Sequence, residues 1–481
     1  MQIKIYGCRG KYTAHFTLLK ARGASVCTAV DVNSPLRGGY YITCAAGWRR
    51  NGNFMINARE KALLTLYEIE YNGAYSNMAL KHAIASGLQK QDKMLVTQLV
   101  YGTVRYKLTL DYIISRYSKI KLKKMSKYVL LILRLGVYQL YFTDKIPESA
   151  AVNESVKLAK RYAPKSSGFV NGILHSVIRG RDGLEFPRER NKFLSVKYSF
   201  PEEIVKIFSE YDFCGELMES LNREPQMTLR LNTLKGTELN IEGANIERSP
   251  LYEYAYYARG LNVAECREYN DGKFTVQDIA AMMVSEALKP QKGEFCIDVC
   301  AAPGGKTTHI AELMENSGKI IAFDIHEHKT EIIRKNAQRM GIDIIETECR
   351  DASEPKPELK GKADKVLVDV PCSGLGIIAR KPDIKWNRED IDTLPVLQYK
   401  ILETAAQYLK PGGELVYSTC TLNKRENEDV ICEFVRRNRE YEFVKIEIPG
   451  PLMRDNGGYI TLFPNIDNTD GFFISKIKRC I

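Results

Sequence analysis

The chain has 481 residues, of which 44% are hydrophobic and 27% are charged, which is the composition of an ordinary water-soluble globular protein. This length is too great for one hydrophobic core and predicts about three domains. The longest strictly aliphatic run, residues 129–133, is far shorter than the ~20 residues of a membrane-spanning helix, so an integral membrane protein is excluded, as are collagen-like, coiled-coil and wholly disordered chains.

The net charge of +11 is concentrated in residues 1–54, which hold eight Lys or Arg residues and a single acid, Asp31. Such an excess suggests a polyanionic partner. The pattern changes at Met55, because Asn57 and Glu60 then form a capping pair and apolar residues follow at helical spacing. We therefore expect Met55 to be the natural start and residues 1–54 to be a non-native upstream extension. A basic targeting or RNA-binding arm is the alternative.

The cysteines indicate a reducing compartment. Twelve scattered cysteines in a chain of this length do not make a disulfide framework, and no Cys-x-x-Cys motif occurs. A structural zinc site is therefore not expected. The sequence shows no secretory signal, so we expect a cytoplasmic protein. We also expect a monomer with no metal and no membrane partner.

Residues 55–190 are expected to form an all-α bundle. Apolar periodicity predicts helices at 92–107, 128–142, 151–162 and 168–179, with Ser167 as the cap of the last. Between two of these helices lies a basic run without acids, made of Arg116, Lys119, Lys121, Lys123, Lys124 and Lys127. Two interpretations stay open for this run, a solvated face or a surface that contacts RNA phosphates.

Residues 187–201 resemble a linker, and residues 196–290 then predict a small α+β (RRM-like) module. Alternating segments at 227–232 and 252–256 favour strands. The tyrosines of the second segment could stack on bases, although strand tyrosines more often pack within a sheet.

From residue 291 to 481 the pattern alternates between strands and helices, which predicts a doubly wound α/β Rossmann-like domain. The expected strands are 295–299, 320–323, 344–347, 366–370 and 414–418. In such a sheet, ligands bind at the carboxyl ends of the strands.

The first of these strands leads into a glycine-rich turn, which consists of Cys300, Ala301, Ala302, Pro303, Gly304, Gly305 and Lys306. The turn lacks the Gly-x-Gly-x-x-Gly pattern of a dinucleotide site, and Cys300 stands where a P-loop requires its first glycine. The remaining interpretation is an adenosine ligand without phosphates. Asp324 would bind the ribose hydroxyls and Asp351 the adenine amine, although a single acid at a strand end is often only a helix cap. The cofactor expected from this combination is S-adenosylmethionine.

Two cysteines follow the fourth and fifth strands. Asp369 ends the fourth strand and precedes Cys372, and Cys420 follows the fifth. If these strands are neighbours, both thiols face the same crevice. A thiolate solves one methyl-transfer problem in particular, because its addition to carbon 6 of a pyrimidine makes carbon 5 nucleophilic while an acid assists at N3.

These motifs resemble the RNA cytosine-C5 methyltransferases of the RsmB (Sun/Fmu) type. The similarity extends over about 425 residues. The helical region resembles the NusB-like RNA-binding domain of that subfamily. The matching segments are 99–102, 168–172, 229–232, 276–278, 300–306, 369–374, 380–383, 418–421 and 470–473. Residues 1–54 have no counterpart in the family, and Val370 replaces a commoner alanine.

The resemblance implies a role for each site residue. Cys420 would be the nucleophile, Cys372 would assist release of the adduct, and Asp369 would be both the acid at N3 and a wall of the cofactor pocket. Residues 300–306 with Asp324 and Asp351 would hold the cofactor. The implied substrate is a single cytosine of protein-free small-subunit (16S) rRNA. Alternatives are another rRNA or tRNA cytosine, a non-catalytic antitermination-like RNA binder, and a P-loop enzyme that hydrolyses nucleotides.

Overall fold

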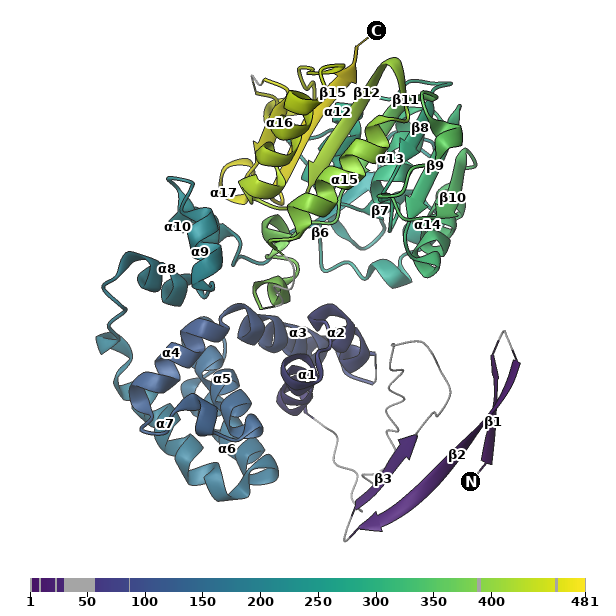
Figure 1. Cartoon of the computed structure of the whole chain (residues 1–481). Coiled ribbons are helices and arrows are strands. Elements are labelled where there is room, and N and C mark those ends of the chain that lie inside the picture. The colour runs from purple at the N-terminus through teal and green to yellow at the C-terminus, as the bar shows by residue number, and fades with distance from the viewer. Residues whose placement is uncertain are drawn as a thin grey trace. The chain divides into compact units, whose positions relative to one another are not determined.

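The computed structural model describes residues 2–7, 10–21, 24–29, 57–85, 87–386, 391–454 and 457–480 (Figure 1). Contacts divide the chain into two compact units, Met1–Ile56 and Asn57–Ile481. The first unit holds an antiparallel sheet of β1 (Gln2–Gly7), β2 (Gly10–Ala21) and β3 (Ala24–Ala29), paired in that order. The origin of residues 1–54 stays a prediction.

The second unit begins with a helical region, as the sequence predicts. The helices are α1 (Ala58–Asn72), α2 (Ser76–Ile84), α3 (Lys90–Arg105), α4 (Lys107–Tyr117), α5 (Lys127–Phe142), α6 (Glu148–Tyr162) and α7 (Ser167–Arg179), with short turns η1 (Leu122–Lys124), η2 (Pro164–Ser166) and η3 (Arg181–Gly183). Helix α5 is almost entirely apolar and packs against α1, α3, α4, α6 and α7. Across the described part of the chain, every helix is too short or too polar to traverse a lipid bilayer.

The two predicted helix caps of this region differ in outcome. Asn57 caps α1, since its side chain accepts a hydrogen bond from the Glu60 N–H at 2.9 Å. The Glu60 carboxylate does not complete a capping box but binds Arg161 and Tyr162. The prediction for Ser167 is wrong. Because η2 runs directly into α7, Ser167 already has helical backbone angles and lies inside the helix.

The prediction of a linker at 187–201 is also wrong, because α8 (Arg190–Tyr198) lies within it. It is followed by α9 (Glu202–Phe208) and α10 (Cys214–Ser220). Leu194, Phe200 and Phe208 are buried in one small core, which explains why this segment is helical rather than extended. The prolines at the two ends of this segment, Pro187 and Pro201, therefore lie on either side of a helix and do not stiffen a linker.

A small antiparallel sheet follows, with strand order β5-β6-β4-β7. Its elements are β4 (Met227–Leu231), β5 (Asn245–Arg248), β6 (Ala255–Arg259) and β7 (Phe274–Val276), with η4 (Val263–Glu265) and α11 (Arg267–Asn270) between the last two. The strand predicted at 252–256 begins only at Ala255. Tyr252 lies in the preceding turn and is buried against Glu286, and Tyr256 is buried as well. These two tyrosines pack inside the protein and are not available for base stacking.

The remainder of the second unit is built on a sheet with strand order β10-β9-β8-β11-β12-β15-β13, in which β14 also pairs with β15. Strands β8 to β12 are parallel and β15 is antiparallel to its neighbours. The strands are β8 (Phe295–Asp298), β9 (Lys319–Asp324), β10 (Ile345–Cys349), β11 (Ala363–Asp369), β12 (Leu409–Thr419), β13 (Tyr441–Phe443), β14 (Tyr459–Leu462) and β15 (Phe472–Arg479). This sheet confirms the predicted doubly wound fold.

Helices cover both faces of this sheet (Figure 1). They are α12 (Ile279–Leu288), α13 (Gly305–Leu313), α14 (Glu327–Met340), α15 (Leu394–Ala406) and α16 (Glu428–Arg437). The short helix α17 (Pro464–Asp467) packs against α10, and the turns are η5 (Pro357–Leu359), η8 (Lys424–Glu426) and η9 (Gly450–Leu452). Alternate strand residues enter two cores. Leu367 and Val416 share one core with α12, α13 and α14, whereas Val366 and Leu415 share the other with α15 and α16.

A segment after β11 joins the sheet to the helical region. It contains η6 (Leu375–Ile377) and η7 (Pro382–Lys385). The Arg105 guanidinium donates to the Ala379 carbonyl at 3.0 Å, and the indole of Trp386 donates to the Val104 carbonyl at 2.9 Å. Contacts thus cross the predicted domain boundaries, and the division at 190 and 290 stays a prediction.

Candidate active site

The glycine-rich turn (Cys300–Lys306) connects β8 to α13, as the sequence predicts. Its backbone is fixed at both ends, because the Ala301 N–H donates to the Phe323 carbonyl and the Gly304 N–H donates to the Ala301 carbonyl. Gly304 has φ +99, and a Cβ at this position would lie 3.3 Å from Ile333. The left-handed backbone therefore favours glycine at this position, and a side chain would also press on Ile333 of α14.

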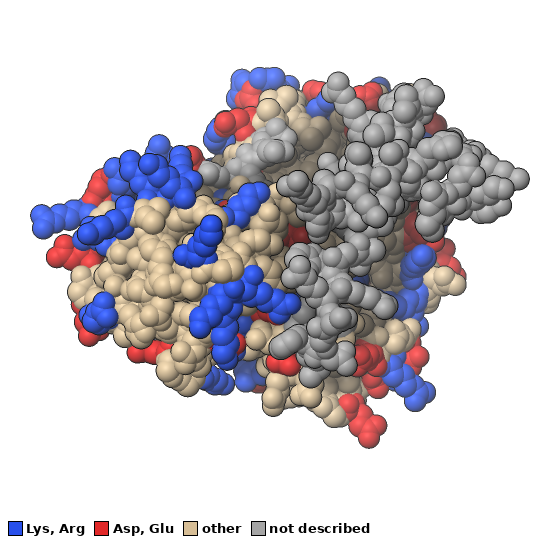
Figure 2. All heavy atoms as spheres, turned by 90° about the horizontal axis from the view of Figure 1, so that it is seen from below, with Lys and Arg blue, Asp and Glu red and all other residues tan. Residues whose placement is uncertain are grey.

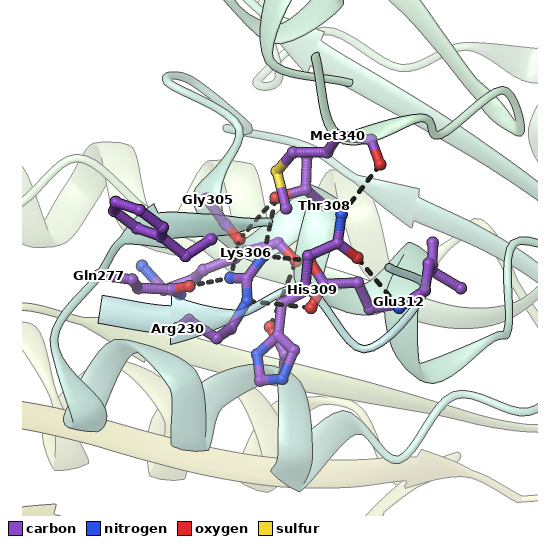
Figure 3. A network of polar contacts seen from close by, with 12 residues as sticks. Arg230, Gln277, Gly305, Lys306, Thr308, His309, Glu312 and Met340 are labelled. Atoms are coloured by element: carbon purple, nitrogen blue, oxygen red, sulfur yellow. Dashed lines mark hydrogen bonds and ion pairs between the residues drawn. The ribbon is translucent and has the colours of Figure 1, made fainter. Parts of the chain in front are cut away.

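A buried arginine supports this turn from below (Figure 3). Arg230 of β4 has no exposed surface and forms an ion pair with Glu312 of α13 at 2.7 Å. The same guanidinium donates to the Gly305 carbonyl at 2.7 Å and to the Thr308 hydroxyl at 3.1 Å, and it also contacts Gln277. The small sheet thus fixes the first turn of α13, which presents the amides of the glycine-rich turn.

Three carboxylates lie at or just after the ends of strands β9, β10 and β11, at the same edge of the sheet. Asp324 ends β9, Asp369 ends β11, and Asp351 lies two residues beyond the end of β10. Asp324 and Asp351 each accept one backbone N–H from the residue two positions later, at 3.0 and 2.8 Å. These bonds match the capping interpretation, but each uses only Oδ1 of a two-oxygen group. The cofactor roles that the sequence predicts for Asp324 and Asp351 stay predictions.

This donor set suits S-adenosylmethionine better than a phosphate-bearing nucleotide. Carboxylates accept hydrogen bonds from hydroxyls and amines but repel phosphates. Lys306 is the cation of the glycine-rich turn, and its ammonium lies 2.7 Å from the Asp369 carboxylate. Since Lys306 is engaged in this way, the edge of the sheet favours a ligand with polar groups and a positive sulfonium. The residues that would hold it are those of the glycine-rich turn with Asp324, Asp351 and Asp369.

The two cysteines lie together at this edge. Strands β11 and β12 are adjacent and parallel, with Asp369 opposite Ser418, which is the adjacency that the sequence prediction required. The sulfur atoms of Cys372 and Cys420 are 3.2 Å apart, within hydrogen-bond distance. Asp369 stands beside this cysteine pair, and its Oδ1 accepts a hydrogen bond from the Ser418 hydroxyl at 2.8 Å.

The electrostatic environment distinguishes the groups of the site. The hydrogen bond with Cys420 and burial raise the pKa of the Cys372 thiol well above its usual range. Burial lowers the pKa of Lys306, but the charge of Asp369 and its hydrogen bond outweigh burial, so the net shift is upward and the ammonium keeps its proton. Burial raises the pKa of the Cys300 thiol, as it does for Cys372, and this makes Cys300 a poor nucleophile.

Sequence reasoning missed two kinds of support. The first is Arg230, which lies within the matching segment 229–232, and a charged residue at an inward position of the buried strand β4 is itself a signal of a buried ion pair. The second is Glu426, whose buried carboxylate accepts a hydrogen bond from Ser373, the residue after Cys372. Nothing in the spacing of Glu426 indicates this position.

Comparisons with known proteins decide the family. A family model described as 16S rRNA methyltransferase RsmB/F matches residues 285–478, and a NusB family model matches residues 56–179. The chain is 37% identical over 449 residues to the probable ribosomal RNA small subunit methyltransferase B of Bacillus subtilis, covering 88% of this chain and 99% of that protein. The chain belongs to this RsmB family. The resemblance inferred from the motifs is therefore confirmed, and so is dependence on S-adenosylmethionine.

Further relatives agree. The ribosomal RNA small subunit methyltransferase B of Vibrio cholerae is 31% identical over 440 residues, covering 89% of this chain and 98% of that protein. Among solved structures, PH0851 matches with a TM-score of 0.72 and 28% identity, covering 88% of this chain and 98% of that chain. The RsmB family relationship thus extends through the helical region and the methyltransferase sheet alike.

Proposed function

We propose that this protein transfers the methyl group of S-adenosylmethionine to carbon 5 of one cytosine in small-subunit (16S) rRNA, through a covalent adduct with Cys420. The observation that supports this most strongly is the cysteine pair, two sulfur atoms 3.2 Å apart at the same strand edge as Asp369. Methyl transfer to an amine or a hydroxyl has no use for two adjacent thiols, whereas methylation at carbon 5 does.

The chemistry follows from the electron demand of the pyrimidine. Carbon 5 of cytosine is too weak a nucleophile to attack a methyl donor directly. The Cys420 thiolate adds to carbon 6 while N3 gains a proton, and carbon 5 then takes the methyl group that S-adenosylmethionine supplies. A base next removes the carbon 5 proton, the C–H electrons form the C5–C6 double bond, the C6–S electron pair returns to Cys420, and N3 gives its proton back to the acid.

The other residues of the site have separate roles in this scheme. Asp369 would be the acid at N3, and the Lys306 ammonium, 2.7 Å from its carboxylate and kept protonated by their ion pair, would position it. Cys372 stays a thiol and assists the departure of Cys420 from the adduct. These assignments use the geometry of the site together with the family resemblance.

RNA is the expected partner. The basic run is exposed in full, at Arg116, Lys119, Lys121, Lys123, Lys124 and Lys127. Figure 2 shows that Lys and Arg side chains gather in several groups over the face seen from below. Such groups bind phosphates, and the release of counterions from the RNA favours this binding. The target cytosine has to leave its stack, which favours a loop or bulge of the RNA. The family resemblance suggests protein-free rRNA as the substrate, and the expected compartment is the cytoplasm.

The test is methyl transfer from labelled S-adenosylmethionine to unmodified, protein-free 16S rRNA, followed by nuclease digestion and chromatography of the nucleosides. We expect label in 5-methylcytidine at a single site. Label in a different nucleoside would refute the carbon 5 assignment, and label only in tRNA or another rRNA would move the substrate. If Cys420→Ser kept the cellular function intact, a non-catalytic RNA-binding role would replace the enzyme.

A further inference from the structure

Glu426 is a buried carboxylate with an unusual set of partners. Its side chain has no exposed surface. Oε1 accepts hydrogen bonds from the Ser373 hydroxyl at 2.5 Å and the Asn423 amide at 2.9 Å. Oε2 accepts from the Ser373 N–H at 2.8 Å and the Gln398 amide at 3.0 Å. Every donor is a neutral group, and within the described residues no Lys or Arg forms an ion pair with Glu426.

The partners of Glu426 connect the segments that carry the two thiols. Ser373 directly follows Cys372, and Thr421 directly follows Cys420. The hydroxyls of Ser373 and Thr421 lie 2.7 Å apart. Because the Ser373 hydroxyl donates to Glu426, it accepts from Thr421, so a directed chain of hydrogen bonds runs from the Cys420 segment through the Cys372 segment to Glu426.

The Cys372 backbone is held on both sides by the same assembly. After the cysteine, the Ser373 N–H is bound to Glu426. Before it, the Pro371 carbonyl accepts a hydrogen bond at 3.0 Å from Gln398, whose amide also binds Glu426. The Cys420 carbonyl in turn accepts the Gly376 N–H at 3.0 Å. Small movements of the Cys372 segment relative to β12 are thereby restricted.

A buried carboxylate without a cation is costly, and a neutral residue of similar size would pack more cheaply. A carboxylate placed here, bound to the segments of both thiols, therefore points to a role in the chemistry. We propose that Glu426 is a positioning residue of the cysteine pair, which holds the Cys372 thiol against Cys420 and acts mainly on release of the RNA adduct. The expected effect of Glu426 on release of the RNA adduct rests on the proposed covalent mechanism. The expected effect of Glu426 on the Cys372 thiol does not.

The electrostatics agree with this geometry. The groups that face Cys372 are Cys420, Glu426, Asp369 and Tyr417. After the hydrogen bond with Cys420 and burial, the negative charges of Glu426 and Asp369 further raise the pKa of Cys372. Cys372 therefore keeps its proton and donates a hydrogen bond to Cys420. That bond stabilises the sulfur as it takes back the C6–S electron pair.

The first experiment needs no RNA. The alkylation rates of Cys372 and Cys420 by iodoacetamide are measured against pH in the full chain, with peptide mass spectrometry to separate the two sites. In Glu426→Gln we expect roughly tenfold faster alkylation of Cys372 at pH 8, because one neighbouring negative charge is lost. The matched control is Asp429→Asn, which removes an exposed charge nearby in α16. An unchanged Cys372 profile in Glu426→Gln would overturn the proposal.

The second experiment separates adduct formation from adduct release on 16S rRNA under single-turnover conditions. In Glu426→Gln we expect formation within about twofold of the wild type and release about tenfold slower, so the adduct accumulates. Equal losses in both steps would indicate a merely structural role and overturn the proposal, as would unchanged release. If Glu426→Gln does not fold, Ser373→Ala breaks the same hydrogen-bond chain, and the same slow release is expected.

The two experiments fail in different ways. If no adduct forms even in the wild type or in Cys372→Ala, the proposed covalent mechanism is wrong, whereas the alkylation profile still decides whether Glu426 controls Cys372. If the adduct forms normally, but Glu426→Gln changes neither the alkylation profile of Cys372 nor the rate of adduct release, only the positioning role is refuted.

Discussion

The glycine-rich turn and the cysteine pair lie at the same edge of one sheet, yet they are supported by opposite means. The turn is supported by a buried ion pair, Arg230 with Glu312, whose arginine comes from a different sheet. The cysteine pair is supported by Glu426, whose donors are the neutral groups of Ser373, Gln398 and Asn423. Loss of a buried ion pair costs stability, whereas loss of a hydrogen-bonded positioning group changes reactivity. The two regions should therefore respond differently to mutation.

The largest effect is expected at Cys420. In Cys420→Ala, methyl transfer should fall by at least about 10⁴-fold, because the nucleophile is gone. Cofactor affinity and the melting temperature should stay unchanged, since a partly exposed thiol contributes little to the core. Transfer assays, calorimetric titration and thermal melts measure the three quantities. The matched control is Cys432→Ala, which removes an exposed cysteine of α16 and should keep full activity. Substantial transfer in Cys420→Ala would contradict the mechanism.

The next effect is expected at Arg230. In Arg230→Met, Glu312 is left buried without its partner, and we expect a loss of about 3–5 kcal/mol in the free energy of unfolding together with weaker cofactor binding. Denaturant titration and cofactor titration measure both. The double variant Arg230→Met with Glu312→Leu should recover part of the stability, because neither charge remains buried alone. A stable single variant with normal cofactor affinity would show that the turn does not depend on this ion pair.

A smaller, pH-dependent effect is expected at Asp298, the last residue of β8. Burial raises its pKa to about 7. The unfolded chain releases this proton near pH 4, so the folded state loses stability as the pH rises from about 4 to 7, and the full loss is present above 7. Asp298→Asn keeps the hydrogen bond from Thr307 but has no charge to bury. Its stability relative to the wild type should therefore be greater at pH 8 than at pH 5.

The expected difference for Asp298→Asn is on the order of 2 kcal/mol, measured by denaturant titration at the two pH values. The exposed substitution Asp343→Asn is the matched control and should show no such difference. If the difference in the free energy of unfolding between Asp298→Asn and the wild type is the same at both pH values, the shifted pKa of Asp298 is contradicted.

Local sequence signals predicted the elements that carry the chemistry, but not the contacts that hold them. Periodicity and glycine placement were sufficient for the sheet and for the glycine-rich turn, because each depends on neighbouring residues. The helix at 190–198 was missed, because its stability comes from burial of Leu194 with Phe208 and not from a strong local pattern. The partners of Arg230 and Glu426 were out of reach, since they depend on which strands and helices become neighbours after folding.

The most direct test of the account is covalent trapping on 16S rRNA in the presence of S-adenosylmethionine, assayed on a denaturing gel. We predict that Cys372→Ala accumulates a stable protein–RNA adduct, and that adding Cys420→Ala to this variant abolishes it. An adduct that appears only when Cys420 is replaced would reverse the roles of the two thiols and contradict the account.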